Sequence, residues 1–567
     1  MQVRRAPMLW LLIGTGIALY VFVMQLMIYY VPAYSAGSDE SAYFLTAKSI
    51  AQRGESGFRC DNPLLFVSEC MVEVRPGVFE QKYPIGFPLL LAAGYKLDGI
   101  TGAFLVNPLF GCLCIVGTVL LARELAGRWA VLVAILLAIH PLLLFHSVGA
   151  MSHVTDTACI VWGMWCLWRW GRSGGMRWAI PAGLLLGYAA CIRYTEAMLG
   201  LVVVWIALCR ARQPSDRSQQ ALPAAGFTRA WWSEVAAMLG AAVLAIAPLM
   251  IFQWKAFGSP FTTGYSFCGE SAAFSAQWFA KHIGPLIVGL NTSGFGHCGA
   301  FPLAAIGLIV WAIAWMVGRP GARGSTHPVG FLLLWVVPSL LLYSAYYWIS
   351  PEPQLYLRLV LGIYPGILIG AALVLKALAT RSRWLAGLMA VMLCALAAAG
   401  RVYPTTEFAL RRDRMMADMV REAAALMPES TRPDSLVIAD YWLAYYFRFA
   451  TNCDVIYPSY VDASWVAKRA ANATLPGQWD FNKLRAKRFF DRLGDRTQDE
   501  LNVILRQEIA QRLGRGHEVL LLTADMEDSG AATAFSLWSK RLGDGLHLTR
   551  IDSSPRQWML YRVELSR

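Results

Sequence analysis

Long apolar runs separated by short polar segments occupy the first 400 residues of the chain. A membrane-spanning helix needs about 20 mostly apolar residues. Runs of this kind predict helices near residues 8–31, 103–122, 129–147, 154–170, 178–192, 196–209, 235–253, 301–318, 329–348, 357–378 and 384–400. The pair 178–192 and 196–209 is short, so a broken or partly re-entrant arrangement stays open there. The pattern predicts an α-helical polytopic membrane protein with about eleven transmembrane helices.

The pattern changes after residue 401, where charge rises and the apolar runs shorten. Short apolar runs predict strands at 435–439, 454–457, 518–523 and 558–563, and helical spacing predicts helices at 412–427 and 441–449. Strands separated by helices are typical of a small α/β domain. We therefore expect two domains, a transmembrane domain over 1–400 and a soluble α/β domain over 401–567.

The distribution of charged residues indicates how the chain is oriented in the membrane and says less about a binding partner. The 567 residues carry a net charge of +13 and a mean hydropathy of +0.45. The basic residues fall in alternate short loops, which predicts a cytoplasmic N-terminus in an inner (plasma) membrane. The first loop, 32–102, and the segment 401–567 are then extracytoplasmic, in a periplasm-like compartment. This distribution disfavours nucleic acid as a partner.

Two of the 12 cysteines, Cys60 and Cys70, lie in the first external loop. A disulfide between them fits an oxidising compartment, and Cys268 with Cys298 is a second candidate pair. No Cys-x-x-Cys motif or Cys/His cluster predicts a zinc site.

The polar stretch from Gly37 to Pro88 directly follows the first apolar run. Residues 39–50 have the spacing of an amphipathic helix lying on the outer interface. Asp39 and Glu40 at its start lie about 100° apart on a helix, so they cannot face the same point. We expect Asp39 to face a site; the alternative is that both only complement the helix dipole.

Lys82 begins a turn that Pro84 and Pro88 stiffen, and Gly86 permits a close backbone approach there. An ammonium group at a membrane surface suits a lipid phosphate. The alternative is a lysine that only extends toward the headgroups.

Further charged residues lie at predicted external helix ends. His153 and Asp156 are three residues apart and share a helix face. Charged residues near a bundle end indicate a site, although Asp156 is equally compatible with a dipole partner. Arg193 and Arg358 stand at two other external ends, where each has the chemistry to pair with phosphate or with a nearby carboxylate.

Taken together, these motifs resemble the GT-C superfamily of membrane glycosyltransferases, over roughly residues 8–400. The likeness is greatest to glycosyltransferase family 39, with the bacterial relatives of protein O-mannosyltransferases and of lipid A aminoarabinose transferase. The motifs are Gly37-Ser38-Asp39-Glu40 with Tyr43, Lys82–Pro88, Met151–Asp156, Phe257–Pro260 with Gly264-Tyr265, and Arg358 before Tyr364-Pro365.

The resemblance implies an inverting transfer of a sugar from a polyprenyl-phosphate carrier to an extracytoplasmic acceptor. It implies that Asp39 is the general base, with His153 or Asp156 as a second acid. The donor phosphate is expected at Lys82, with Tyr83, Glu40, Arg193 and Arg358 around it. The sugar stays open, as does the acceptor, which the resemblance allows to be a lipid, a glycan or a protein.

The resemblance leaves the cofactor open. Some relatives place an acid directly before the lysine and use it with a divalent metal, whereas this chain has Gln81 there. We therefore assign no metal ligand and no certain cofactor, and a divalent metal stays an alternative.

Two other functions compete with the transferase. A transporter places charges near the bilayer midplane on broken helices, often in two matching halves. A non-catalytic lipid-binding assembly protein needs neither Asp39 nor Lys82. The polar residues gather at one face and no halves match, which favours the transferase.

Overall fold

The computed structural model describes residues 5–30, 37–68, 70–211, 227–267, 274–292, 302–307, 309, 328–347, 353–428, 434–439, 441–451, 453–464, 467, 496–524, 538–553 and 558–566. Two expectations fall wholly or mostly outside these residues: the pairing of Cys268 with Cys298, and the predicted helix 301–318.

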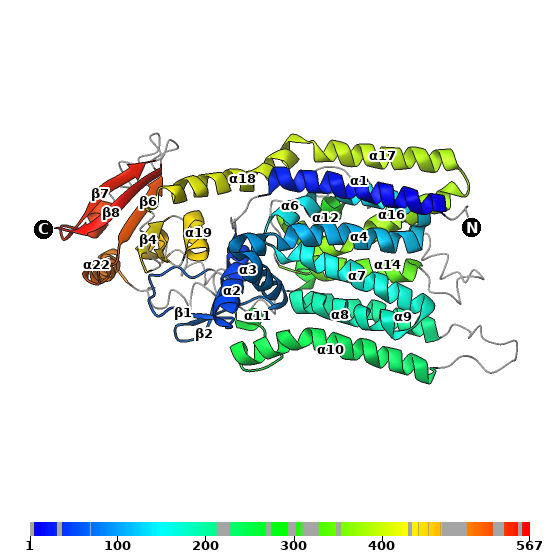
Figure 1. Cartoon of the computed structure of the whole chain (residues 1–567), viewed down its shortest axis with the longest axis horizontal. Coiled ribbons are helices and arrows are strands. Elements are labelled where there is room, and N and C mark those ends of the chain that lie inside the picture. The colour runs from blue at the N-terminus through cyan, green and yellow to red at the C-terminus, as the bar shows by residue number, and fades with distance from the viewer. Residues whose placement is uncertain are drawn as a thin grey trace.

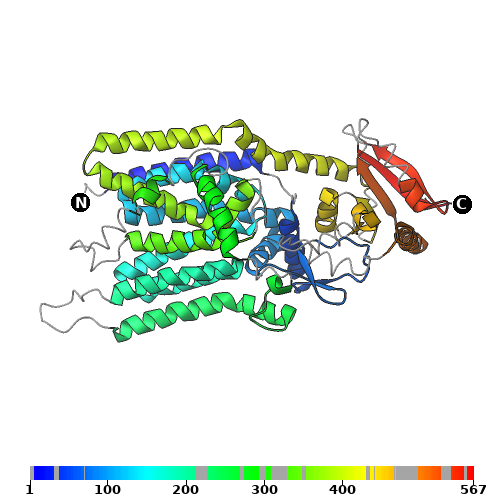
Figure 2. The ribbon, with the colours of Figure 1, turned by 180° about the vertical axis from the view of Figure 1, so that it is seen from behind.

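A bundle of long helices forms one half of the molecule (Figures 1 and 2). Its longer members are α1 (Arg5–Tyr29), α4 (Val106–Ala126), α5 (Ala130–Ala138), α7 (Ser152–Ser173), α8 (Met176–Ile192), α9 (Gly200–Ala211), α10 (Arg229–Phe257), α14 (Pro328–Ser344), α16 (Tyr364–Ala379) and α17 (Arg383–Arg401). Shorter helices are α6 (Pro141–Val148), α11 (Gly264–Phe267), α12 (Ala276–Thr292) and α15 (Pro353–Leu357), with 3-10 turns η2 (Gly127–Trp129), η3 (Tyr194–Leu199) and η5 (Arg358–Ile363).

Six segments in the described part of the chain are long and apolar enough to cross a membrane. They are Met8–Tyr29, Val106–Ala138, Tyr194–Ala211, Arg229–Phe257, Leu355–Ala379 and Arg383–Arg401, and two shorter apolar helices are Met176–Ile192 and Pro328–Ser344. The chain is thus a mostly helical multi-pass membrane protein. The pair predicted at 178–192 and 196–209 forms α8 and α9, joined by the 3-10 turn η3.

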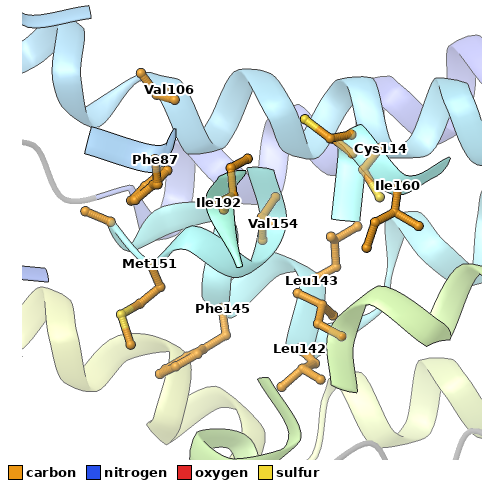
Figure 3. Close-up of a cluster of buried hydrophobic side chains, with 14 of the residues drawn as sticks. Phe87, Val106, Cys114, Leu142, Leu143, Phe145, Met151, Val154, Ile160 and Ile192 are labelled. Atoms are coloured by element: carbon orange, nitrogen blue, oxygen red, sulfur yellow. The ribbon is translucent and has the colours of Figure 1, made fainter. Parts of the chain in front are cut away.

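Apolar side chains from α3, α4, α6, α7 and α8 form the core at one end of the bundle (Figure 3). Phe87, Leu142, Leu143 and Val154 are fully buried there. This core supports the turn that follows Lys82, because Phe87 begins the helix next to it.

The first loop folds as two helices and a small sheet at this end of the bundle. The predicted amphipathic helix is confirmed as α2 (Ser38–Arg53), preceded by Gly37, and α3 (Gly86–Phe104) follows the sheet. A Cβ atom on Gly86 would lie 2.6 Å from the carbonyl oxygen of Cys191, so α3 begins directly against the backbone of α8. Strands β1 (Phe58–Arg59), β2 (Met71–Arg75) and β3 (Val78–Gln81), not predicted, form an antiparallel sheet in the order β1-β3-β2.

The C-terminal segment contains a mixed five-stranded sheet in the order β5-β4-β6-β8-β7, at the far end from the N-terminus (Figure 1). The four predicted strands are confirmed as β4 (Leu436–Ala439), β5 (Asp454–Ile456), β6 (Val519–Ala524) and β8 (Trp558–Leu565), whereas β7 (Leu546–Ser553) was missed. β4 runs parallel to β5 and β6, and β8 runs antiparallel to β6 and β7. The helices are α18 (Pro404–Ala425), α19 (Tyr441–Ala450) and α22 (Gln498–Gly514), with a 3-10 turn η6 (Pro458–Val461).

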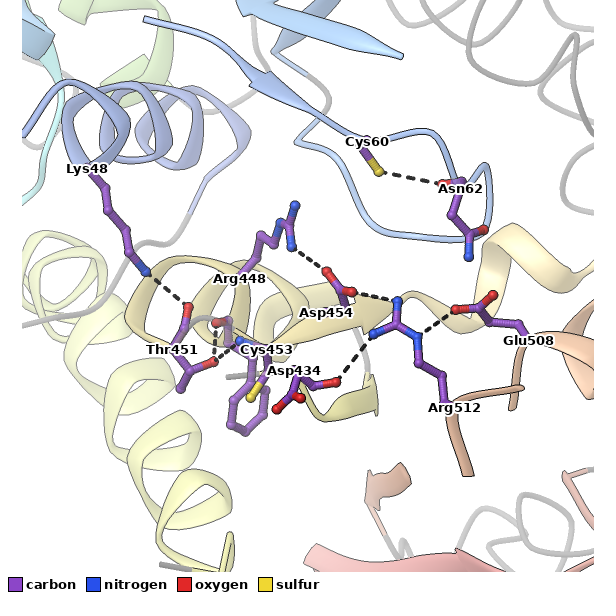
Figure 4. Close-up of polar contacts among 11 residues, drawn as sticks. Lys48, Cys60, Asn62, Asp434, Arg448, Thr451, Cys453, Asp454, Glu508 and Arg512 are labelled. Atoms are coloured by element: carbon purple, nitrogen blue, oxygen red, sulfur yellow. Dashed lines mark hydrogen bonds and ion pairs between the residues drawn. The ribbon is translucent and has the colours of Figure 1, made fainter. Parts of the chain in front are cut away.

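The first loop is attached to this C-terminal sheet. Leu65 forms an antiparallel bridge with Ile456, and the backbone N–H of Phe66 donates to the carbonyl of Val455 over 2.6 Å. The Phe66 ring is fully buried among aromatic residues of the C-terminal segment. Lys48 of α2 also donates to the carbonyl oxygen of Thr451 over 3.0 Å, as Figure 4 shows. The helix that carries Asp39 is therefore held from the C-terminal side as well as from the bundle.

The expected Cys60–Cys70 disulfide is wrong, because neither cysteine is disulfide-bonded and both are buried. The Cys60 N–H bonds Gly77 at one end of β3, and the Cys70 carbonyl accepts from the Lys82 N–H at the other end. Four residues of strand separate these ends by roughly 13 Å, which is beyond the reach of a disulfide. Cys70 Sγ instead donates to Asp39 Oδ1 over 3.0 Å.

Candidate active site

Asp39 lies in the first turn of α2, and its carboxylate receives three side chains from different parts of the chain. Arg358 donates from Nη2 to Oδ2 over 2.8 Å. Cys70 Sγ and the Tyr83 hydroxyl both donate to Oδ1. Two residues that are 319 positions apart in the sequence, Asp39 and Arg358, thus meet at one carboxylate.

Lys82 is buried in the turn directly after β3, beside the same carboxylate. Its Nζ lies 4.6 Å from the centre of the Tyr83 ring and 5.6 Å from that of Tyr265. A Cβ atom on Gly264 would come within 2.5 Å of the Lys82 backbone oxygen. The Gly264-Tyr265 pair therefore packs on Lys82, since only glycine leaves room for that approach.

The cations around Asp39 control its protonation. Burial acts to raise the pKa of the Asp39 carboxyl, but Arg358, Lys82 and the hydrogen bonds from Cys70 and Tyr83 outweigh burial. The pKa of Asp39 is consequently held below its usual range, and the side chain is an anion in this state. Burial and the Asp39 charge raise the pKa of Tyr83, so its hydroxyl keeps the proton that it donates.

Tyrosine rings form a wall beside these charges. The Tyr83 ring centre lies 4.9 Å from that of Tyr43 and 5.9 Å from that of Tyr265, and Tyr194 lies 5.7 Å from Tyr265. Sequence reasoning quoted Tyr43 and Tyr265 only as parts of motifs and missed Tyr194. Their spacing along the chain carries no sign of the contact, because four separate elements supply the rings.

Glu40 points away from Asp39. Its Oε1 accepts from the backbone N–H of Ala150 over 3.0 Å, which fastens α2 to the turn before α7. The expectation that the two acids face different points is confirmed. Glu40, which was expected near the donor phosphate, is buried against this turn.

A second buried cluster lies beside the first, where α7 meets η3. Arg193 Nε lies 3.7 Å from Asp156 Oδ2 and 3.8 Å from Glu196 Oε1, and Arg193 Nη2 donates to the Tyr343 hydroxyl over 2.6 Å. His153 is buried, and neither ring nitrogen has a hydrogen-bond partner among the described residues. Arg193 is therefore occupied by two carboxylates and a tyrosine.

The described residues contain no group of three His, Cys, Asp or Glu side chains placed to hold a metal ion. Gln81, which precedes Lys82, donates from Nε2 to the carbonyl of Pro84 over 3.2 Å and so braces the turn.

Comparison with known proteins adds a family. Residues 82–228 match the family described as dolichyl-phosphate-mannose-protein mannosyltransferase. This match begins at Lys82 and spans His153, Asp156 and Arg193. This part of the chain is therefore similar to a family of membrane glycosyltransferases. No curated protein sequence matches the chain.

Solved structures of ArnT share the fold of this chain over nearly its whole length. ArnT from Cupriavidus metallidurans, bound to undecaprenyl phosphate, is 14% identical with a TM-score of 0.55, and the match covers 98% of both chains. The apo form of ArnT gives the same identity and TM-score over 98% and 97% of the chains. An oligosaccharyltransferase from Archaeoglobus fulgidus is 14% identical with a TM-score of 0.46, over 98% of this chain and 74% of that one.

Proposed function

We propose that this protein is a glycosyltransferase that transfers a sugar from a polyprenyl-phosphate carrier to an extracytoplasmic acceptor, which is a lipid, a glycan or a protein, with inversion at the anomeric carbon. The observation that carries the proposal is the meeting of Asp39, Arg358, Lys82 and Tyr83 at one point. The matched family and the polyprenyl phosphate bound to ArnT support the same carrier chemistry.

Lys82 and Arg358 are the proposed donor-phosphate ligands. A phosphate diester needs charge stabilisation more than protonation when it departs, and a fixed cation in a partly dry site supplies it. Both side chains are largely buried, so they offer this charge without a large solvent shell. Arg193 is a weaker candidate for this role because Asp156, Glu196 and Tyr343 already engage it.

Asp39 is the proposed general base. As the acceptor oxygen bonds to the anomeric carbon, the bond from that carbon to the phosphate oxygen breaks and the polyprenyl phosphate leaves. The acceptor proton passes to Asp39. In the state described here Asp39 is a weak base, because Arg358 and Lys82 lower its pKa. A donor phosphate that attracts both cations would raise the basicity of Asp39 when the donor is in place.

His153 and Asp156 are proposed as supporting residues rather than as a second acid in contact with the leaving group. His153 packs 5.8 Å from the ring centre of His146, and Asp156 pairs with Arg193. Their position beside Asp39 suits a role in fixing the end of α7.

We also propose that the chain crosses the membrane about eleven times. We place the N-terminus in the cytoplasm, and residues 32–102 and 401–567 outside, with 1–400 as the catalytic membrane domain. The six long apolar segments and the two shorter apolar helices support several spans. The alternation of basic loops supports the orientation.

The test uses purified full-length protein in detergent with a panel of polyprenyl-phosphate sugars. Release of free polyprenyl phosphate, measured by mass spectrometry, is the expected outcome with at least one sugar and an acceptor extract. Asp39→Asn serves as the inactive control. Absence of release with every donor, from protein that is folded and monodisperse, would contradict the proposed carrier.

A further inference from the structure

A cavity of about 920 Å³ lies on the side of the first loop that faces α10. It is bounded by the end of α2, the β1–β3 sheet, the start of α3 and the last turns of α10. Neither Asp39 nor Lys82 lines it. The cavity is therefore separate from the candidate active site, although Lys82 lies only two residues beyond its lining residue Glu80.

One wall of the cavity is apolar. Ile85 and Phe252 are buried, and Ile50 and Leu89 are half-buried beside them. Phe252 belongs to the last part of the candidate membrane span Arg229–Phe257. The apolar wall thus continues from a surface of α10 that meets lipid in the membrane, where Ile251 is exposed.

The rim of the cavity is basic. Arg59 and Arg75 of the small sheet and Lys255 at the end of α10 are exposed and line it, against one exposed carboxylate, Glu55. Three cations and one anion at the end of a membrane span favour a negatively charged headgroup.

The floor of the cavity holds a buried carboxyl group. Glu80 is 8% exposed, and its Oε2 has no hydrogen-bond partner among the described residues. Such a group is costly unless a ligand or water satisfies it. Burial raises the pKa of Glu80 to about 7, which Ser56 and Arg75 oppose and Glu55 reinforces. A neutral carboxyl near neutral pH tolerates an anionic ligand and both donates and accepts hydrogen bonds.

We propose that this cavity binds the head of a membrane lipid that carries a phosphate diester and free hydroxyl groups. The phosphate lies at Arg59, Arg75 and Lys255, a hydroxyl bonds Glu80, and the acyl chains leave along the apolar wall toward α10. This site does not depend on the transfer reaction, so it stands or falls independently of the proposed function.

The experiment measures lipid binding to delipidated full-length protein in a neutral detergent by native mass spectrometry. The probes are phosphatidylglycerol, phosphatidic acid, phosphatidylcholine and soluble glycerol 1-phosphate. We expect phosphatidylglycerol to bind about 10-fold tighter than phosphatidylcholine, from the charge-assisted contacts that the choline lipid weakens. It should bind about 3- to 10-fold tighter than phosphatidic acid, from the hydroxyl contact.

Variants separate the two contacts. Arg75→Ala combined with Lys255→Ala should remove the preference over phosphatidylcholine. Glu80→Leu should remove the preference over phosphatidic acid, and Glu80→Gln, which keeps an acceptor oxygen, should retain part of it. Lys96→Ala, an exposed lysine of α3 outside the cavity, is the matched control and should change neither.

Three outcomes would overturn the proposal. These are equal binding of all three lipids, a preference over phosphatidic acid that is undiminished in Glu80→Gln or a preference over phosphatidylcholine that is undiminished in the Arg75/Lys255 double variant, and glycerol 1-phosphate binding as tight as the lipid. The last would assign the cavity to a soluble phosphate. Because the Glu80→Gln and double variants keep the packing volume of the floor, a folding failure of Glu80→Leu leaves the test intact.

Discussion

Two carboxylate–arginine pairs lie side by side at the end of the bundle, and they differ in every respect that matters for chemistry. Asp39 meets Arg358 at 2.8 Å, and its side chain is 21% exposed. Asp156 meets Arg193 at 3.7 Å, and its side chain is 4% exposed. Glu196 also shares Arg193 with Asp156, so two carboxylates meet one arginine there.

The difference indicates separate tasks. A charged pair that reaches solvent can exchange its partner for a substrate phosphate at small cost, because water replaces what is lost. A buried cluster cannot, since removing one partner leaves an uncompensated charge away from water. We therefore infer that Asp39–Arg358 takes part in catalysis and that Asp156–Arg193–Glu196 maintains the structure around it.

The largest expected effect comes from Asp39→Asn. Loss of a general base lowers the rate of transfer by about 10²- to 10⁴-fold. The turnover of the polyprenyl-phosphate donor measures this rate. Asp156→Asn is the matched control, because Arg193 keeps Glu196 as a partner in that variant. We expect Asp156→Asn to change the rate of transfer by less than about 10-fold. A reversed order, with Asp156→Asn the more damaging, would move the base to the buried cluster.

The second largest effect is expected on stability, in a comparison of variants at Arg193 and Arg358. Arg193→Gln leaves two buried carboxylates without their cation, so we expect a loss of about 3–5 kcal/mol of stability. Arg358→Gln acts on a single carboxylate that keeps Lys82, Cys70 and Tyr83 beside it, so it should cost less stability than Arg193→Gln. Thermal unfolding of both variants in the same detergent checks this. Equal melting temperatures would remove the distinction between the clusters.

The same two regions show what the sequence can predict. Asp39 and Lys82 were recognisable because each stands beside strong local signals, a helix start and a Pro/Gly-stiffened turn. The Cys70 and Tyr83 contacts to Asp39 were not, since they depend on how β2 and β3 pair. The disulfide prediction failed for the same reason, because pairing in the short sheet β1-β3-β2 separates two cysteines only ten residues apart.

Element type was predicted better than long-range contact. Four strands of the C-terminal sheet follow from their apolar runs, but β7 reads Leu-His-Leu-Thr-Arg-Ile-Asp-Ser, and its polar alternation hid it. The attachment of Leu65 and Phe66 to β5 has no local signal, since the partners lie nearly 400 residues apart. Such contacts are decided by tertiary packing that no short window of sequence contains.

A smaller effect should separate the phosphate ligands from the base. Lys82→Ala and Arg358→Ala each remove one charge-assisted contact, which is worth about 10- to 100-fold in affinity. We expect this loss in the KM for the lipid donor, with the acceptor KM little changed, as steady-state kinetics with varied donor would show. Arg383→Ala, at the opposite end of the bundle, is the control. An unchanged donor KM in both variants would place the phosphate elsewhere.

The smallest effect comes from a third carboxyl, Glu80, where burial outweighs the hydrogen bond from Ser56 and the attraction of Arg75, in contrast to Asp39. Its pKa in the folded protein is about 7, above the ordinary value of 4.5, so the folded state holds an extra proton between these values. Stability should therefore fall as pH rises from about 4.5 to 7, by on the order of 1–3 kcal/mol, since each pKa unit is worth about 1.4 kcal/mol. Glu80→Gln cannot ionise and should lose that part of the pH dependence, whereas Glu55→Gln on the exposed rim should keep it. Melting curves of the three proteins between pH 5 and pH 8 check this prediction. If stability changes with pH by the same amount in all three, Glu80 ionises with an ordinary pKa, and the contrast in pKa between Glu80 and Asp39 is removed.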